Sequence, residues 1–357
     1  MGKKYIRIQE LEPERQKKSK VIAVMNNKGG CGKTSTAIAL GMYLARTGNN
    51  VLFWDGDPQC NLTQRLGIAD NTINRTLNTI FRKPEDKIEI TQIMKYPHLQ
   101  RVRKGPLSLG AIGIMPGDHM SERAAMQLEE RFLEYSRQTE RDVGYGSTEN
   151  YIQSIFEEKQ KYFDYIVMDT APALQGNTLN ILALKVSNEI IYPVDSIEAM
   201  TGLDEILSWM GNQTMHRSDK PNGLFAMVKY QQDTVDMMAT DSIIKNAVFR
   251  SMKKVFKDFV CNTGVKELRS LRLGRKSIPG FGGTTEYTKL SAEIIEKIQK
   301  PERKNLFEYI DENGVIKILA DEIGALSQMT IKHEPRRREP QFRPRKIDAE
   351  VVLDGTK

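Results

Sequence analysis

The chain has 357 residues, of which 39% are hydrophobic and 28% are charged, a balance that supports a large core and argues against global disorder. No apolar run reaches the ~18 residues that a membrane-spanning helix needs, and the N-terminus lacks the apolar stretch of a secretory signal. Three widely spaced cysteines, Cys31, Cys60 and Cys261, argue against a disulfide framework or a zinc site and fit a reducing cytoplasm.

The net charge of +7 is concentrated at the two ends. Residues 1–20 contain seven Lys or Arg and three Glu, and residues 332–346 contain seven Lys or Arg and two Glu. Such arms are either solvated tails or contacts for nucleic acid or another polyanion, and composition leaves both open. Because the chain after about residue 328 is rich in Pro and Arg, we predict a disordered tail there.

The first folded unit is a strand, a turn, a helix and a second strand. Residues 21–25 (VIAVM) are an apolar run of the buried-strand kind, residues 34–46 predict a helix that Gly48 ends, and residues 51–54 (VLFW) predict the next strand. This order predicts an α/β fold in which helices flank a doubly wound, mostly parallel sheet.

The later elements follow the same alternation. Apolar runs predict strands at Ile112–Met115, 165–168, Glu189–Val194 and 223–228; amphipathic or charged patterns predict helices at 119–142, 241–260 and 284–299; and 141–150 has the composition of a surface loop. We therefore expect a basic N-terminal arm over 1–20, one α/β domain over 21–300, a C-terminal extension over 301–330 and a basic tail with disorder over 331–357.

The turn after the first strand reads NKGGCGKT over residues 27–34. Small residues let the backbone N–H groups point at phosphate oxygens, and the N-terminus of the following helix adds positive charge. Lys33 would reach the β- and γ-phosphates and the Thr34 hydroxyl would bind Mg²⁺. This P-loop pattern predicts a nucleotide site made of Gly29, Gly30, Cys31, Gly32, Lys33, Thr34 and Ser35. Simple phosphate binding does not need Lys28 at the start of the turn, and a solvated loop charge is its plainer alternative.

Carboxylates end two further predicted strands. Asp55 and Asp57 follow residues 51–54 in the sequence WDGDPQCNLT, and Asp169 follows residues 165–168 in YIVMDTAP. Ligands of open α/β sheets bind outside this edge, and carboxylates there hold Mg²⁺ or orient water. We predict metal ligation by Thr34, Asp55 and Asp169. For Asp55 and Asp57 alone, a solvated turn is an equal alternative.

The three motifs together resemble the deviant Walker A ATPases of the ParA/MinD family, and the Asp57 segment is similar to the D-x-D-P-Q-x-N-x-T stretch of ParA partition ATPases. The resemblance covers most of residues 20–300. It implies ATP and Mg²⁺ as cofactors, a nucleotide-sandwich homodimer in which Lys28 reaches the partner's phosphates, and an Asp57 that positions the attacking water. It also implies that residues 170–172 act as a second switch segment. The stretch 227–234 lacks an Arg that the family usually has there.

The resemblance further implies slow, partner-stimulated ATP hydrolysis, binding to nonspecific DNA and a ParB-like centromere-binding partner, in a cytoplasmic, nucleoid-associated protein without membrane contact. Basic residues crowd the region where this family contacts DNA, namely Lys266, Arg269, Arg272, Arg275 and Lys276. A solvated charged face is the plainer alternative. A ParA/MinD-like ATPase that positions a protein cargo, and a metabolic P-loop ligase or kinase, also remain open.

Overall fold

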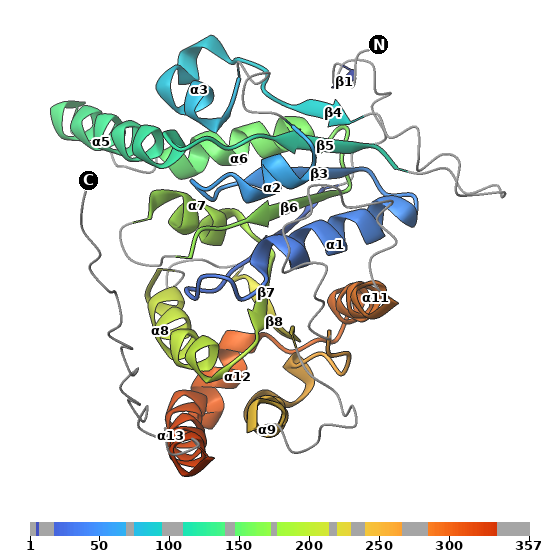
Figure 1. Cartoon of the computed structure of the whole chain (residues 1–357). Helices are drawn as coiled ribbons and strands as arrows, with labels where there is room; N and C mark the ends of the chain where they lie inside the picture. The colour runs from blue at the N-terminus through green and yellow to red at the C-terminus, as the bar shows by residue number, and fades with distance from the viewer. Residues whose placement is uncertain are drawn as a thin grey trace, which may run out of the picture.

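A computed structural model describes residues 5–6, 18–68, 75–94, 110–139, 147–172, 177–213, 220–229, 240–265 and 285–333 of the chain (Figure 1). Within them, eight strands form one sheet in the order β1-β4-β5-β3-β6-β2-β7-β8. Pairing from β5 through β8 is parallel, and β1 and β4 add an antiparallel edge. The strands are β1 (Tyr5–Ile6), β2 (Lys20–Val24), β3 (Val51–Asp55), β4 (Gln92–Met94), β5 (Ile112–Met115), β6 (Tyr165–Asp169), β7 (Glu189–Val194) and β8 (Asn222–Met227). The predicted doubly wound, mostly parallel sheet is confirmed.

Helices cover both faces of the sheet because side chains alternate along each buried strand. Val21 and Ala23 of β2 point into one core cluster, and Ile22 and Val24 point into the other. The second cluster lies under α1 (Lys33–Arg46), α2 (Asn61–Arg65) and α11 (Thr285–Gln299). The first lies under α3 (Leu77–Arg82), α5 (Ser121–Thr139), α6 (Thr148–Lys159), α7 (Thr178–Val186), α8 (Ile197–Gln213), α9 (Thr240–Phe256), α12 (Leu306–Asn313) and α13 (Val315–His333). Two short 3₁₀ turns, η3 (Pro84–Asp86) and η5 (Lys257–Phe259), complete the described elements.

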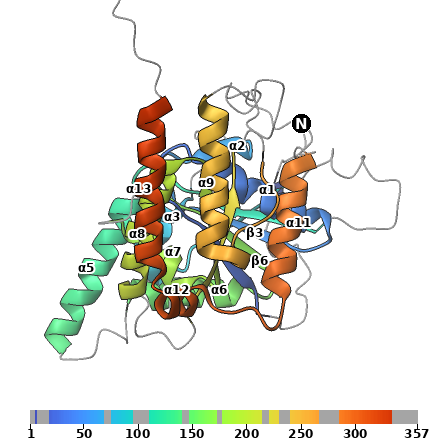
Figure 2. The same ribbon diagram turned by 90° about the horizontal axis from the view of Figure 1, so that it is seen from below.

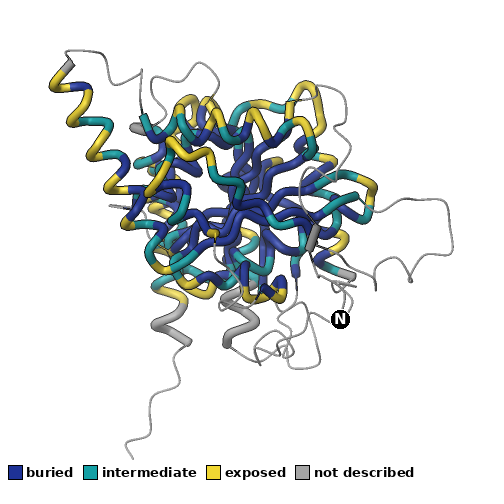
Figure 3. Tube along the Cα trace, turned by 90° about the horizontal axis from the view of Figure 1, so that it is seen from above, coloured by how far each residue is buried: buried dark blue, intermediate teal, exposed yellow. Residues whose placement is uncertain are grey.

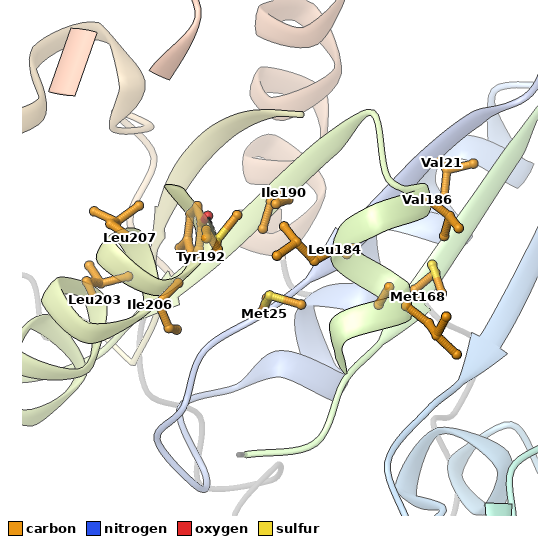
Figure 4. Packing of buried hydrophobic residues seen from close by; sticks show 14 of the residues in the cluster. Val21, Met25, Met168, Leu184, Val186, Ile190, Tyr192, Leu203, Ile206 and Leu207 are labelled. Atoms are coloured by element: carbon orange, nitrogen blue, oxygen red, sulfur yellow. Dashed lines mark hydrogen bonds between the residues drawn. The ribbon is translucent and has the colours of Figure 1, made fainter. Parts of the chain in front are cut away.

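The strands form the centre of the molecule, and exposed residues gather on the outer faces of the helices (Figure 3). Figure 4 shows Tyr192 of β7 beside Leu203, Ile206 and Leu207 of α8, and Ile190 of the same strand beside Leu184 of α7. Each of these side chains is almost fully removed from water, so this interface contributes hydrophobic stabilisation of about 25 cal/mol per Å² of apolar surface buried. The packing fixes α8 against the strand whose end supplies part of the candidate site.

Glycine 41 allows α1 to approach the sheet closely. A Cβ atom at Gly41 would lie 2.2 Å from the Phe53 ring of β3, far inside van der Waals contact. Phe53 itself is completely buried. The close packing of α1 on the sheet therefore requires a residue without a Cβ atom at position 41.

Every strand and helix predicted in the core is present, with ends that shift by a few residues. Four predictions need correction. Tyr5–Ile6 of the basic N-terminal arm pairs with β4 as a short strand. The predicted helix over 241–260 ends as an α-helix at Phe256 and continues as a 3₁₀ turn, whereas residues 140–142 of the predicted helix over 119–142 lie outside the described residues. The predicted loop over 141–150 includes the start of α6, which Ser147 caps by accepting from the Asn150 N–H. Residues 329–333, predicted as disordered, continue α13, because Leu326 and its neighbours still pack on the core.

The segment predicted as a C-terminal extension forms α12 and α13. The helix α13 packs against α8 and α9, and Figure 2 shows α13 and α9 side by side. Before α12, Arg303 donates to Glu189 at 2.7 Å and to the Gly223 carbonyl, which fastens this segment to β7 and β8. The extension therefore covers one face of the same sheet. The residues of the predicted basic tail from 334 onward lie outside the described residues.

Candidate functional site

The strand register brings the three sequence motifs to one edge of the sheet. Val24 of β2 and Asp55 of β3 both lie opposite Asp169 of β6. The turn after β2, residues 27–32, and the Asp57 segment after β3 therefore start beside the same carboxylate. This juxtaposition is what parallel strands with neighbouring carboxyl ends require.

The turn has the backbone geometry of a phosphate-binding loop. Gly30 and Gly32 have φ of 74° and 94°, values that residues with a side chain rarely adopt. The helix α1 begins at Lys33, and its first internal bond runs from the Thr36 N–H to the Gly32 carbonyl. The N–H groups of Lys33, Thr34 and Ser35 thus lie at the helix N-terminus, where anions bind.

Lys33 is buried and folded back on its own loop. Its Nζ donates to the Lys28 carbonyl at 2.9 Å and lies 4.0 Å from the Cys31 Sγ. Burial raises the pKa of the Cys31 thiol, and the Lys33 charge opposes that effect. The lysine is therefore already inside the loop that the sequence assigns to phosphates.

Asp169 is the carboxylate of the site that lacks hydrogen-bond partners in the described part of the chain. It is completely buried, and neither of its carboxylate oxygens has a hydrogen-bond partner. Burial raises the pKa of Asp169 to about 8, and the negative charge of Asp55 adds to the effect, whereas the Thr34 side chain and Lys33 lower it in part. A buried carboxylate without donors is costly, and a bound cation would remove that cost.

These residues fit a magnesium ion that a nucleotide completes. Among the described residues, no group of three or more His, Cys, Asp or Glu side chains could hold a metal alone. Mg²⁺ characteristically takes one or two carboxylates and the oxygens of substrate phosphates. The free oxygens of Asp169 beside the Thr34 side chain match that ligand set.

Asp55 has a different environment, because its carboxylate holds the helix α2. Its Oδ2 accepts from the Thr63 N–H at 2.8 Å and from the Thr63 hydroxyl at 2.6 Å. Burial raises the pKa of Asp55 to about 6, and the Thr63 bonds oppose this. Asp57 is also buried and accepts from the Gln59 N–H at 2.9 Å. Asp55 therefore anchors the segment on which Asp57 stands.

A buried amide holds the segment after β6. The Asn180 side chain of α7 accepts from the Ala171 N–H at 3.1 Å and donates to the Ala171 carbonyl at 3.0 Å. The Thr170 hydroxyl donates to the Val24 carbonyl at 2.8 Å. The predicted second switch segment is thus tied to β2 and to α7.

Lys28 contacts the turn between β7 and α8. Its Nζ lies 2.6 Å from the Ser196 hydroxyl, 3.2 Å from Asp195 and 3.4 Å from Glu198. The other oxygen of Asp195 lies 3.3 Å from the Nζ of Lys229, which also donates to the Gly30 carbonyl. One nearly buried carboxylate therefore holds two cations next to the phosphate-binding loop.

The residues predicted to bind DNA, Lys266, Arg269, Arg272, Arg275 and Lys276, lie outside the described residues. Three basic residues on and after α9 have partners within the protein. Lys253 donates to the Val260 carbonyl and to Asn262, Lys254 pairs with Glu322, and Lys257 lies 5.8 Å above the Tyr309 ring. These three side chains therefore contribute to the packing of the C-terminal helices.

The sequence did not single out Thr63, Asn180, Asp195 or Lys229. Each is an ordinary polar residue in the chain, and its importance comes from a partner on another strand or helix. One signal was available: the Asp195-Ser196 pair follows a predicted strand, as the functional carboxylates do.

A family model described as an AAA domain matches residues 19–220. The chain is 27% identical over 288 residues to the chromosome-partitioning ATPase Soj of Treponema pallidum, covering 78% of this chain and 98% of that protein. It is 28% identical over 255 residues to the sporulation initiation inhibitor protein Soj of Bacillus subtilis, covering 71% and 86%.

Among solved structures, cobyrinic acid a,c-diamide synthase from Mycobacterium smegmatis with bound ATP analog and magnesium aligns with a TM-score of 0.55 at 18% identity, over 80% of this chain and 98% of that one. This likeness shows a shared fold. None of the helices in the described part of the chain has the length and apolar character to cross a bilayer.

Proposed function

The chain belongs to the AAA domain family, as a ParA-type ATPase of the ParA/MinD kind, and from this premise we propose that it is a DNA partition ATPase. In this proposal it hydrolyses ATP slowly to ADP and phosphate, and a ParB-like centromere-binding protein stimulates the reaction. Its ATP-bound form is a sandwich dimer that binds DNA without sequence preference. The partition role follows the Treponema pallidum relative, which is named a chromosome-partitioning ATPase.

The proposed nucleotide site combines the phosphate-binding turn with the two carboxylate motifs. Gly29, Gly30, Cys31, Gly32 and the N-terminus of α1 would surround the phosphates, and Lys33 would exchange the Lys28 carbonyl for a phosphate oxygen. Thr34 and Asp169 would hold Mg²⁺, with Asp55 supporting the metal shell. The ion, when bound, supplies charge neutralisation at the β- and γ-phosphates.

The observation that carries this proposal is the unpartnered Asp169 carboxylate beside the N-terminus of α1. If Asp169 only ended strand β6, we would expect its side chain to be hydrogen-bonded or exposed. The fully buried, donor-free carboxylate instead suits a site that a cation and a polyphosphate complete.

Hydrolysis in this proposal uses Asp57 and Lys28. Asp57 would hold the attacking water, and the anchoring of α2 through Thr63 and Asp55 would fix its position. Lys28 would act on the phosphates of the other subunit, where a cation stabilises the charge that develops in the transition state. To do so it must leave Asp195, Ser196 and Glu198, which bind it within its own chain.

Two substitutions test the assignment. Lys33→Ala should lose nucleotide binding, because it removes the phosphate-binding ammonium. Asp57→Ala should bind ATP and yet lose turnover, because it removes only the group that orients water. Equilibrium binding of a fluorescent ATP analogue and phosphate release on the same preparations separate the two effects. Normal phosphate release by Asp57→Ala would contradict the role of Asp57.

The alternative function is an ATPase of the same kind that positions a protein cargo. The partners of Lys253, Lys254 and Lys257 favour this alternative to the extent that they remove three cations from a DNA-binding face. The proposed DNA-binding cluster, Lys266, Arg269, Arg272, Arg275 and Lys276, is unaffected by that argument. ATP-dependent DNA binding that weakens steeply with salt distinguishes partition from cargo positioning.

A further inference from the structure

A guanidinium group reaches the phosphate-binding helix from outside the three sequence motifs. Arg65 is the last residue of α2, and its Nη1 donates to the Ser35 hydroxyl of α1 at 3.0 Å. Among the described residues, Ser35 is the one hydrogen-bond partner of Arg65. A guanidinium carries five N–H donors, and this bond engages one of them.

Ser35 lies directly at the end of α1 that faces the phosphates. It is the third residue of the helix, and its N–H precedes the first internal hydrogen bond, which Thr36 makes. The Arg65 side chain is therefore fixed beside a helix N-terminus that already favours anions.

A second contact places Arg65 in the same corner. Tyr287 of α11 is buried close to Gly32, and a Cβ atom on Gly32 would lie 3.9 Å from its hydroxyl. Burial raises the pKa of Tyr287 to about 12, while the nearby Thr36 side chain and the Arg65 charge lower it in part. Tyr287, Ser35 and Arg65 therefore lie close together beside the phosphate-binding turn.

The backbone that carries Arg65 is rigidly attached to the site. Thr63, two residues earlier on α2, makes two hydrogen bonds to Asp55 at the carboxyl end of β3. The side chain of Arg65 is exposed, whereas Thr63 is completely buried. The helix α2 therefore holds an exposed cation close to the edge of the sheet.

We propose that Arg65 binds the α-phosphate of the nucleotide. Its guanidinium would exchange the hydrogen bond to the Ser35 hydroxyl for bonds to the phosphate oxygens. This inference rests on the proposed ATP site and adds a residue to it. In a P-loop the lysine and the following threonine serve the β- and γ-phosphates, here through Lys33 and Thr34. Ser35 follows Thr34 by one residue, so a guanidinium beside Ser35 would reach the α-phosphate, which Lys33 and Thr34 do not serve. The planar guanidinium can donate two parallel bonds to it.

The test compares binding of Mg-ATP and Mg-ADP to the full chain and to Arg65→Gln, by isothermal titration calorimetry. Both nucleotides carry an α-phosphate, so both affinities should fall by the same factor, about tenfold for one lost charge-assisted contact. Arg65→Lys keeps the charge but not the fork and should recover part of the loss. Arg137→Gln, at an exposed position on α5, makes the same change in charge and should leave both affinities unchanged.

Three results would overturn the assignment. Equal affinities for Arg65→Gln and the unmodified chain would show that the guanidinium makes no phosphate contact. A loss confined to ATP would move the contact to the γ-phosphate. If the unmodified chain bound neither nucleotide, the proposed ATP site would fail and Arg65 with it. Far-UV circular dichroism and the thermal midpoint of each variant show whether it is folded.

Discussion

At the scale of single residues, the site is a cluster of buried charges that are satisfied to different degrees. Asp55 has two donors from Thr63, and Asp195 has two lysines, whereas Asp169 has no hydrogen-bond donor. Burying a polar group without a partner costs free energy, so a folded protein retains one only where something else compensates. The difference in hydrogen bonding therefore sets Asp169 apart from Asp55 and Asp195.

This difference predicts a stability effect in magnesium-free buffer. Asp169 has a pKa of about 8 in the folded chain and 3.8 as an ordinary aspartate, so the folded state holds a proton that the unfolded state releases. Its contribution to stability is present below pH 4 and is lost as the pH rises toward 8. Asp169→Asn cannot ionise, so it should exceed the unmodified chain in unfolding free energy by about 1–3 kcal/mol at pH 9.

Urea unfolding at pH 5 and pH 9, in the presence of a chelator, measures this effect. The advantage of Asp169→Asn should be smaller at pH 5 than at pH 9. Asp321→Asn, on the exposed side of α13, provides a matched control and should show no such pH dependence. A variant that is less stable than the unmodified chain at pH 9 would refute the assignment of an unpartnered charge.

At the scale of helices and strands, the C-terminal helices belong to the core. Buried apolar residues of α12 and α13 join the cluster on one face of the sheet, namely Leu306, Phe307, Ile310, Val315, Leu319 and Leu326. The link before them is fastened by Arg303 to β7 and β8. The stability of the ATPase fold therefore depends on residues beyond 300.

Two adjacent residues of α13 test this dependence. Leu319 is fully buried, whereas Ile318 is 41% exposed. Leu319→Ala should lower the free energy of unfolding by about 2–5 kcal/mol, because it leaves a cavity between α13 and the core. Ile318→Ala should change it by less than about 0.5 kcal/mol. Chemical denaturation of both variants measures the difference, and equal effects would show that α13 is not part of the cooperative core.

The strands and the phosphate-binding turn could be predicted because their signals are local. An apolar run such as 165–168 followed by Asp169 indicates a strand end without reference to any other segment. The contacts Arg65–Ser35 and Asn180–Ala171 could not be predicted, because each joins residues whose proximity only the folded sheet creates. The same holds for α13: its packing against α8 and α9 is set by tertiary contact, although the apolar spacing of Val315, Leu319 and Leu326 permits a helix.

At the scale of the whole molecule, several lysines are engaged by other parts of the protein. Lys253, Lys254 and Lys257 contact other parts of the protein, and so do Lys28 and Lys229. The Lys and Arg residues at 266–276 and at 336–346 lie outside the described residues. We expect these two segments to carry the proposed DNA binding.

Their contributions can be separated with fluorescence anisotropy on a random DNA duplex. In the presence of a slowly hydrolysed ATP analogue, binding should weaken steeply with salt, because each phosphate contact releases counterions. Neutralising Arg269, Arg272 and Arg275 to Gln should reduce the affinity about tenfold or more and flatten the salt dependence. Truncation after His333, the last residue of α13, removes the tail without shortening a helix. Absence of DNA binding by the unmodified chain with the ATP analogue would favour cargo positioning over partition.

The close approach of Gly41 to Phe53 ties the mechanics of the site to a position that touches no ligand. Since α1 carries the phosphate-binding loop at its start, anything that lifts the helix from the sheet also displaces that loop relative to Asp169. A single methyl group added at position 41 would clash with the Phe53 ring and push α1 away from the sheet. The position of the proposed nucleotide site therefore depends partly on steric clearance in the middle of α1, about two turns from the start of the helix at Lys33.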